Sequence, residues 1–216
     1  MTKILATSDT HFAFDGGCWP RCDVFIHAGD IMYSGKPEEW WKLRNSLDGV
    51  IADTKYLVPG NHDKYIEENE VWVKEELAQT GIELVLPSQP VVRLPSGHRM
   101  LTIPFVVNLP RWSYNRTEES IRDFLYGWWP DTLGPDIVVS HCPPFGYLDK
   151  VPGDGSVGSK AMRGWVESLY KKPTVWICGH IHEGYGSVSD GPTTFYNVAH
   201  CNEEYQQVNA PMEIAI

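Results

Sequence analysis

The pattern that decides the fold first appears in residues 4–11, which read Ile4-Leu5-Ala6-Thr7-Ser8-Asp9-Thr10-His11. A short apolar run, typical of a strand that is buried on both faces, is followed at once by a carboxylate and an imidazole. The same arrangement recurs four more times along the chain. Apolar runs at 24–26, 56–58, 137–139 and 175–177 are followed by Gly29-Asp30, Gly60-Asn61-His62-Asp63, His141 and Gly179-His180-Ile181-His182.

Segments between these runs predict helices that cover a sheet. Pro37 suits the first turn of one helix, because its ring already has the helical φ. A second helix is expected over residues 64–78, and Thr117 can cap the start of a third. The first two helices carry apolar residues at helical spacing, namely Trp40, Leu43, Leu47, Ile66, Val73 and Leu77.

Other segments predict strands that no helix separates. Residues 83–107 contain apolar runs on both sides of Pro95-Ser96-Gly97, which indicates antiparallel strands and a turn. Residues 193–198 and 211–216 also have the composition of strands. Together these elements predict an α/β protein, a two-sheet β-sandwich flanked by helices with mixed parallel and antiparallel strands. We expect it to form a single domain over residues 1–216.

The composition excludes some functions. The net charge of −10 argues against extended nucleic-acid binding, because such binding needs clustered positive charge. No window approaches the roughly 20 apolar residues of a membrane-spanning helix, and the first residues are too weakly apolar for a signal peptide. We therefore expect a cytoplasmic protein without a membrane partner. Its five scattered cysteines are expected to be reduced and mostly buried, at positions Cys18, Cys22, Cys142, Cys178 and Cys201.

The polar residues after the five apolar runs predict a metal centre. The carboxyl ends of parallel strands meet at one edge of a sheet, where α/β proteins gather their ligands. Carboxylates and neutral imidazoles suit manganese, iron, zinc or nickel, and two such ions roughly 3.5–4 Å apart can hold a hydroxide and phosphoryl oxygens. Asp30 stands alone after its strand, so its two oxygens make it the candidate to bridge two ions. Any one of these residues alone would more often be an ordinary core or turn residue, but all of them together rarely would.

On these motifs and their order, the sequence resembles the calcineurin-like metallophosphoesterases over nearly its whole length. It is most similar to their small metallophosphoesterase-domain branch, the brain protein 239-like proteins. The narrower resemblance is carried by Asn108-Leu109-Pro110-Arg111, His141-Cys142-Pro143-Pro144-Phe145-Gly146, Gly179-His180-Ile181-His182-Glu183-Gly184-Tyr185-Gly186, and Asn197 with Cys201. The chain departs from many members after the bridging aspartate, where it reads Ile31-Met32-Tyr33-Ser34-Gly35 instead of containing an acidic residue or a threonine.

The resemblance implies a role for each motif residue. His62 would face the leaving-group oxygen as a proton donor without binding metal, and Asp63 would orient a neighbouring imidazole. The nucleophile would be a hydroxide activated by two divalent ions (Mn, Fe, Zn or Ni), with Mn the choice for assays in vitro. The first ion would be held by Asp9, His11 and His182, the second by Asn61, His141 and His180, and Asp30 would bridge them.

We therefore expect a dinuclear-metal phosphodiesterase for small phosphate diesters, and the resemblance points to cyclic nucleotides. The alternatives are a phosphomonoesterase on the same centre and a non-catalytic scaffold of the same fold. Arg111, in a loop with aromatic neighbours, is the candidate for substrate contact. Residues 153–160 superficially resemble a phosphate-binding loop, but Ser159 precedes Lys160 and no apolar strand comes before them. We expect them to form a mobile surface loop that could edge the site, and the sequence indicates no oligomeric state.

Overall fold

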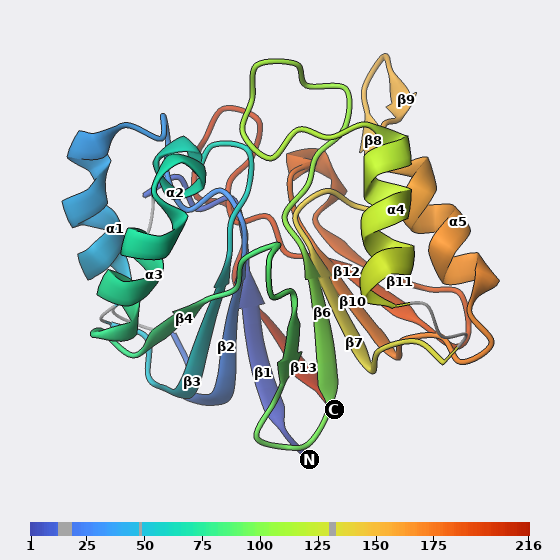
Figure 1. Cartoon of the computed structure of the whole chain (residues 1–216), viewed down its shortest axis with the longest axis horizontal. Coiled ribbons are helices and arrows are strands. Elements are labelled where there is room, and N and C mark those ends of the chain that lie inside the picture. The colour runs from blue at the N-terminus through green and yellow to red at the C-terminus, as the bar shows by residue number, and fades with distance from the viewer. Residues whose placement is uncertain (13–18, 48, 130–132) are drawn as a thin grey trace.

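The computed structural model describes residues 1–12, 19–47, 49–129 and 133–216, and most of its strands lie in two sheets that face each other (Figure 1). The first sheet has the order β13-β1-β2-β3-β4. Its strands are β1 (Lys3–Thr7), β2 (Cys22–Ala28), β3 (Ala52–Val58), β4 (Ile82–Leu84) and β13 (Met212–Ala215). The second has the order β11-β12-β10-β7-β6-β5. Its strands are β5 (Val91–Arg93), β6 (Arg99–Ile103), β7 (Ile137–Ser140), β10 (Val175–Cys178), β11 (Gly186–Ser189) and β12 (Thr194–Asn197).

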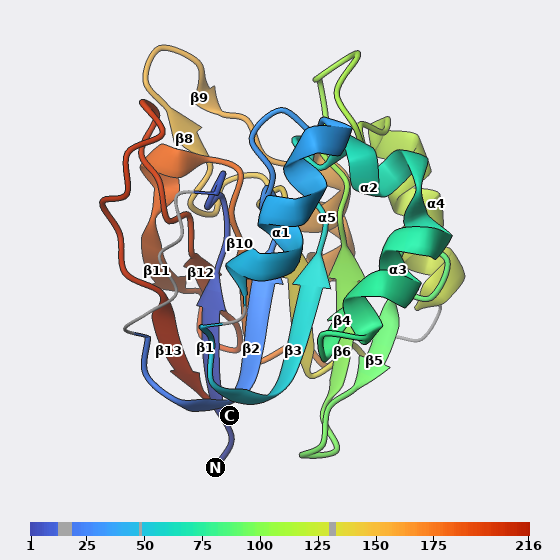
Figure 2. The same cartoon turned by 90° about the vertical axis from the view of Figure 1, so that its left-hand side faces the viewer.

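Both sheets have a parallel centre and an antiparallel edge. Strands β1 to β4 pair in parallel, and β13 pairs with β1 in the opposite direction. In the second sheet β6, β7, β10 and β12 are parallel, while β5 and β11 are antiparallel. The carboxyl ends of the parallel strands therefore lie at one end of the molecule, the upper end in Figures 1 and 2. The predicted mixture of strand directions is confirmed.

The alternation of side chains along the strands builds the core. Ile4 and Ala6 of β1 pack between the two sheets, whereas Leu5 packs against the helices outside the first sheet. In the second sheet Trp176 packs outward, while its neighbour Ile177 joins the layer between the sheets. Because each sheet is covered on both faces, its central strands are apolar at consecutive positions, which is why they appear as continuous runs in the sequence.

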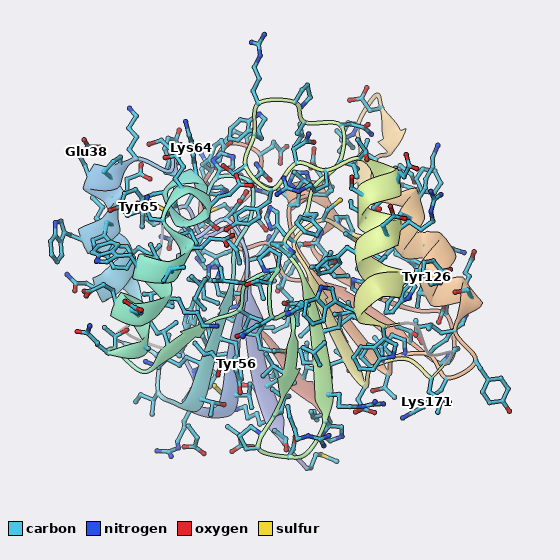
Figure 3. All side chains as sticks on the ribbon, viewed as in Figure 1. Glu38, Tyr56, Lys64, Tyr65, Tyr126 and Lys171 are labelled. Atoms are coloured by element: carbon cyan, nitrogen blue, oxygen red, sulfur yellow. The ribbon has the colours of Figure 1, made fainter. Side chains whose placement is uncertain are left out.

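Helices cover the two outer faces (Figure 1). Figure 3 places Lys64 and Tyr65, on the first turn of α2, towards the upper end, and Tyr56 and Lys171 towards the lower end. The first sheet is covered by α1 (Trp40–Ser46), which continues the 3-10 turn η1 (Pro37–Glu39), and by α2 (Lys64–Glu68) and α3 (Glu70–Ala78). The second is covered by α4 (Glu118–Trp128) and α5 (Lys160–Ser168).

Local signals for helices and turns were mostly correct. Thr117 caps α4, and its hydroxyl accepts the Ser120 N–H at 3.1 Å. The single helix expected over 64–78 is wrong, because the chain breaks at Asn69. There the Asn69 side-chain amide donates to the Tyr65 carbonyl at 3.0 Å, which replaces the main-chain bond that would continue the helix.

The antiparallel prediction for residues 83–107 is only half correct. The hairpin of β5 and β6 around Pro95-Ser96-Gly97 is antiparallel, but β4 is parallel to β3, and β6 is parallel to β7. The apolar pattern cannot reveal strand direction, because direction depends on which strand becomes the neighbour. The described cysteines, Cys22, Cys142, Cys178 and Cys201, are free and buried as predicted, and Cys18 lies outside the described residues. Within the described part of the chain, no helix has the length and apolar character needed to cross a membrane.

Candidate metal centre

Four proposed ligands lie in a strained backbone conformation just after the strands. Asp9, His11, Asp30 and His180 have φ values of 51°, 45°, 56° and 67°, a left-handed region that residues other than glycine seldom adopt. Main-chain hydrogen bonds between the strand ends hold these turns. The Asp9 N–H donates to the Gly29 carbonyl at 2.8 Å, and the His11 N–H donates to the Asp30 carbonyl at 3.2 Å. Strain of this kind is typical of functional sites, since the surrounding structure must hold it in place.

The two carboxylates divide their oxygens between the backbone and the histidines. Asp9 is fully buried, and its Oδ2 accepts from the Ser8 hydroxyl at 2.5 Å and from the His180 N–H at 2.9 Å. Its Oδ1 lies 3.5 Å from His182 Nε2. Asp30 is 2% exposed, and its Oδ1 accepts the N–H of His62 at 2.7 Å.

Each of four histidine rings is oriented by a hydrogen bond from Nδ1 to a backbone carbonyl. Because a carbonyl can only accept, Nδ1 carries the hydrogen and Nε2 is left to face the centre. The pairs are His11 with Met32 at 3.0 Å, His62 with Tyr33 at 2.5 Å, His141 with Ala28 at 2.9 Å, and His182 with Asn202 at 2.7 Å. Such outer hydrogen bonds are the usual means by which proteins orient metal-binding imidazoles.

The structure brings the seven proposed ligands together. Asn61 Oδ1 lies 3.0 Å from His141 Nε2, which is itself 3.3 Å from Asp30 Oδ2. Among the described residues, three groups of His and Asp place their ligand atoms within 4.8 Å of one another: Asp9-His11-His182, Asp30-His141-His180 and His11-Asp30-His62. The first consists of the residues that the resemblance implies for one ion, and the second joins His141 and His180, implied for the other ion, to Asp30. The third adds His62, whose Nε2 lies 4.0 Å from Asp30 Oδ2.

Opposite charges offset the cost of burying this centre. Burial tends to raise the pKa of Asp9 and Asp30, but the neighbouring histidines outweigh it and hold both pKa values below the ordinary range. Burial lowers the pKa of an imidazole, yet the charge of Asp30 raises the pKa of His141 to about 9, and the neighbouring Asp9 carboxylate raises the pKa of His182 to about 9. Burial dominates at His180 and lowers its pKa to about 4.

The donor set fits divalent metal ions. Asp9 Oδ1 and His11 Nε2 are buried and have no hydrogen-bond partner, although a buried polar atom normally has one. Both belong to the group formed with His182, so the two atoms without partners lie where one ion would bind. Carboxylate, imidazole and amide donors without a thiolate suit manganese, iron, zinc or nickel.

Glycines allow the strand ends to approach one another. A Cβ on Gly179 would collide with Ser8 Oγ and Asp9 Oδ2, and one on Gly60 would collide with Asp30 Oδ1. Gly29 has a φ of 104°, and a Cβ there would collide with the His141 ring. These three positions explain why a glycine accompanies each of three motifs.

The predicted role of Asp63 needs correction. Its carboxylate accepts the backbone N–H groups of Asp30 at 3.0 Å, Met32 at 2.9 Å and Gly60 at 2.7 Å, and none of its hydrogen bonds involves an imidazole. Asp63 therefore fixes the loop that carries Asp30. Burial, followed by the charge of Asp30, raises its pKa to about 7.

Sequence reasoning assigned no role to two residues that position the His180–His182 segment. The side-chain amide of Asn197 donates to the carbonyl of Ile181 at 2.8 Å and to that of Leu148 at 3.2 Å. The Asn202 carbonyl accepts from the His182 ring. Asn197 carries the signal used for the other motifs, since it is a polar residue that ends an apolar strand, whereas Asn202 carries none.

Two cavities meet at this centre. The smaller, about 280 Å³, is lined by Asp30, Asn61, His62, Leu109, Trp112, His180, His182, Glu183, Glu203 and Tyr205. The larger, about 640 Å³, shares Leu109, His180 and Glu183 with it and is bounded by a hairpin of β8 (Lys150–Val151) and β9 (Gly155–Ser156). The segment 153–160 thus edges the site through this hairpin. Arg111 is exposed and lines neither cavity, so the structure does not bring this predicted substrate contact to the centre.

Comparison with known families agrees with this geometry. The model of the calcineurin-like phosphoesterases matches residues 2–184 of the chain. The chain belongs to this family. The match spans every motif from Asp9 to His182, so the resemblance noted in the sequence is confirmed.

Relatives of this phosphoesterase include metallophosphoesterase domain-containing protein 1 of Homo sapiens and of Mus musculus. Each relative is 30% identical to this chain, and the match covers 99% of this chain and 70% of the relative's own length. Among solved structures, one superposes with a TM-score of 0.66 at 19% identity, covering 91% of this chain and 90% of that one. A putative 5'-nucleotidase from Staphylococcus aureus superposes with a TM-score of 0.55 at 12% identity, covering 98% and 53%. These two show the fold alone.

Substitution of a glycine tests the proposed centre. Gly179→Ala should lower the affinity for Mn²⁺ at least about 10-fold, because the new methyl displaces the Asp9 carboxylate. Isothermal titration calorimetry measures the affinity. Gly164→Ala in α5, where an added Cβ meets nothing within 4 Å, is the matched control and should bind like the wild type. Wild-type affinity in Gly179→Ala would show that Asp9 is not a ligand.

Proposed function

We propose that this chain is a dinuclear-metal phosphodiesterase that hydrolyses small phosphate diesters. The observation that carries the proposal is the convergence of two buried carboxylates, five imidazoles and one amide at the carboxyl ends of the strands, where five of these eight residues line a cavity. Membership in a phosphoesterase family supports the reaction class. A scaffold that had lost catalysis would not be expected to keep a donor set for two ions.

The proposed ligands fall into two sets that share one carboxylate. Asp9, His11 and His182 would hold one ion, and Asn61, His141 and His180 the other. Asp30 would bridge them, because its carboxylate groups with His141 and His180 of one set and with His11 of the other. When bound, the ions lower the pKa of a water molecule and neutralise charge on the phosphoryl oxygens.

His62 is proposed to protonate the leaving group. Its Nδ1–H is committed to the Tyr33 carbonyl, so Nε2 is the nitrogen that faces the cavity. In the reaction, water oxygen bonds to phosphorus, and the phosphorus–oxygen bond to the departing alcohol breaks. The electron pair of that bond goes to the alcohol oxygen, which takes the Nε2 proton of the doubly protonated His62 ring, and the proton lost by water restores that form of the ring.

The pair of cavities favours a diester over a monoester. A diester has two ester oxygens on one phosphate, carrying two organic groups or, in a cyclic nucleotide, one nucleoside bonded twice, and two spaces open from the same centre. A monoester would need only one of them. We include in the proposal cyclic nucleotides as substrates, manganese as the metal for assays, a single domain over residues 1–216 and a cytoplasmic location.

A substrate comparison tests the function. The protein loaded with Mn²⁺ should hydrolyse bis(4-nitrophenyl) phosphate with a higher kcat/KM than 4-nitrophenyl phosphate, and it should turn over cyclic nucleotides. Release of nitrophenolate measures hydrolysis of the two nitrophenyl esters, and chromatography of nucleotides measures turnover of cyclic nucleotides. Faster hydrolysis of the monoester would favour the phosphomonoesterase, and no turnover by a protein that holds metal would favour the scaffold.

Removal of a proposed ligand should abolish metal binding and activity together. Asp30→Asn and His141→Ala each remove a proposed donor to the metal ions. His141 Nε2 lies close to both Asp30 and Asn61, so either change alters the same part of the centre. Elemental analysis and nitrophenolate release are the two measurements. The controls make the same substitutions away from the centre, at Asp53, which forms an exposed ion pair, and at His98, which lies in a turn. Asp53→Asn and His98→Ala should both behave like the wild type. Full metal content in Asp30→Asn would refute its bridging role.

His62→Gln should separate metal binding from catalysis. Glutamine can still bond the Tyr33 carbonyl but supplies no readily transferred proton, so kcat should fall by roughly 10²–10⁴ while metal content stays at the wild-type level. The loss should be smaller for substrates whose leaving alcohol is more acidic, because such an alcohol needs less protonation. Loss of metal in this variant would mean that His62 is a ligand.

A further inference from the structure

We propose that the larger cavity binds the organic group that stays on phosphorus, and that this group is apolar or aromatic and uncharged. The inference deepens the proposed phosphodiesterase function and rests on it. The cavity of about 640 Å³ is lined by His180 and not by His62, and among the described residues only Leu109, His180 and Glu183 line both spaces. Its volume lies within the range of typical small-molecule sites.

The position of His62 decides which group occupies which cavity. His62 lines the smaller cavity, where its ring contacts Trp112 at a centroid distance of 4.5 Å, and it does not line the larger one. The ester oxygen that receives the proton of His62 therefore faces the smaller cavity. The remaining substituent, which keeps its bond to phosphorus throughout the reaction, is left with the larger one.

Hydrogen bonds and close packing hold the wall of the larger cavity in place. The buried carboxylate of Asp149 accepts the N–H groups of Gly146 and Gly158, each at 2.9 Å, and so joins the two ends of the hairpin loop. A Cβ on Gly158 would collide with the Pro143 carbonyl, which shows how closely the segments pack. The Asn197 amide ties this wall to the metal-binding segment through Leu148 and Ile181. The cavity thus keeps a fixed position relative to His180.

The lining specifies the chemistry of the group. The apolar part of the wall is contributed by six of its fourteen lining residues, Val107, Leu109, Phe145, Val151, Val157 and Ile181. Its charged residues are three carboxylates, Glu118, Asp154 and Glu183, against the single ammonium of Lys160. Glu118 already accepts the N–H groups of Lys160 and Ala161 at 2.8 Å. A substituent with a second phosphate would lie beside these three carboxylates, whereas an aromatic or apolar group would bury its surface against the apolar residues.

Two esters with one leaving group test the assignment. Phenyl 4-nitrophenyl phosphate and methyl 4-nitrophenyl phosphate both release nitrophenolate and differ only in the group that stays on phosphorus. For the wild type we expect a kcat/KM about 10-fold or more higher for the phenyl ester, because its ring is buried in the larger cavity. Val157→Trp should reduce this ratio to less than about threefold, because the indole occupies the space of the ring.

Further variants separate loss of the cavity from loss of the fold. Val151→Trp fills the cavity from the other strand of the hairpin and should have the same effect. Val188→Trp, the same substitution at an exposed position of β11, should keep the wild-type ratio. Thermal unfolding shows which variants are folded. An unchanged ratio in folded Val157→Trp or Val151→Trp would overturn the inference.

A binding experiment distinguishes failure of the inference from failure of the proposed function. Titration calorimetry on the metal-loaded protein should show tighter binding of diphenyl phosphate than of dimethyl phosphate, and Val157→Trp should reduce the difference. If neither ester is hydrolysed but this difference is present, the phosphodiesterase proposal fails while the binding preference of the cavity stands. Equal binding of both phosphates by the wild type would overturn the cavity assignment, even if the protein hydrolyses diesters.

Discussion

The rest of the centre depends on two carboxylates, Asp9 and Asp30, that lie buried at the ends of neighbouring strands. A buried charge is costly unless it is paired, and these two also repel each other. His141 and His182 supply the opposite charge, and the backbone N–H groups of His62 and His180 supply hydrogen bonds. The carboxylates therefore require loops from both sheets to meet at one end of the fold. Metal ions bound beside Asp9 and Asp30 would also compensate the buried negative charge of these carboxylates.

The geometry that satisfies these carboxylates imposes backbone strain. Four of the proposed ligands have a positive φ, and three glycines are needed where a Cβ would strike a ligand side chain. Asp63 offsets part of this cost, since it binds three backbone N–H groups in the turn after β2 and in the Gly60 loop. The apolar layers below the centre hold these turns in place, so the β-sandwich supports the strained turns that follow its strands.

The sequence predicted the five central strands and the ligand candidates because both signals are local. It failed where one side chain interrupts a local pattern or where a distant segment decides the outcome. Asn69 breaks a helix through its own side chain, and β4 is parallel because β3 is its neighbour. Asp63 binds backbone amides that only the folded loops bring near it. Arg111 had the right chemistry for a phosphate, but its loop directs Leu109 and Trp112 to the cavity instead.

The sequence by itself determined which residues are candidates for the chemistry, because an apolar run followed by a polar motif is complete within a few residues. It also determined that these motifs share one edge, since parallel strands end on the same side. Only the tertiary structure decided which nitrogen of each imidazole faces the centre. The His141 ring, for example, is oriented by the carbonyl of Ala28, 113 residues away in the chain. The two cavities were also decided by the tertiary structure, because their walls form only when distant loops pack against one another.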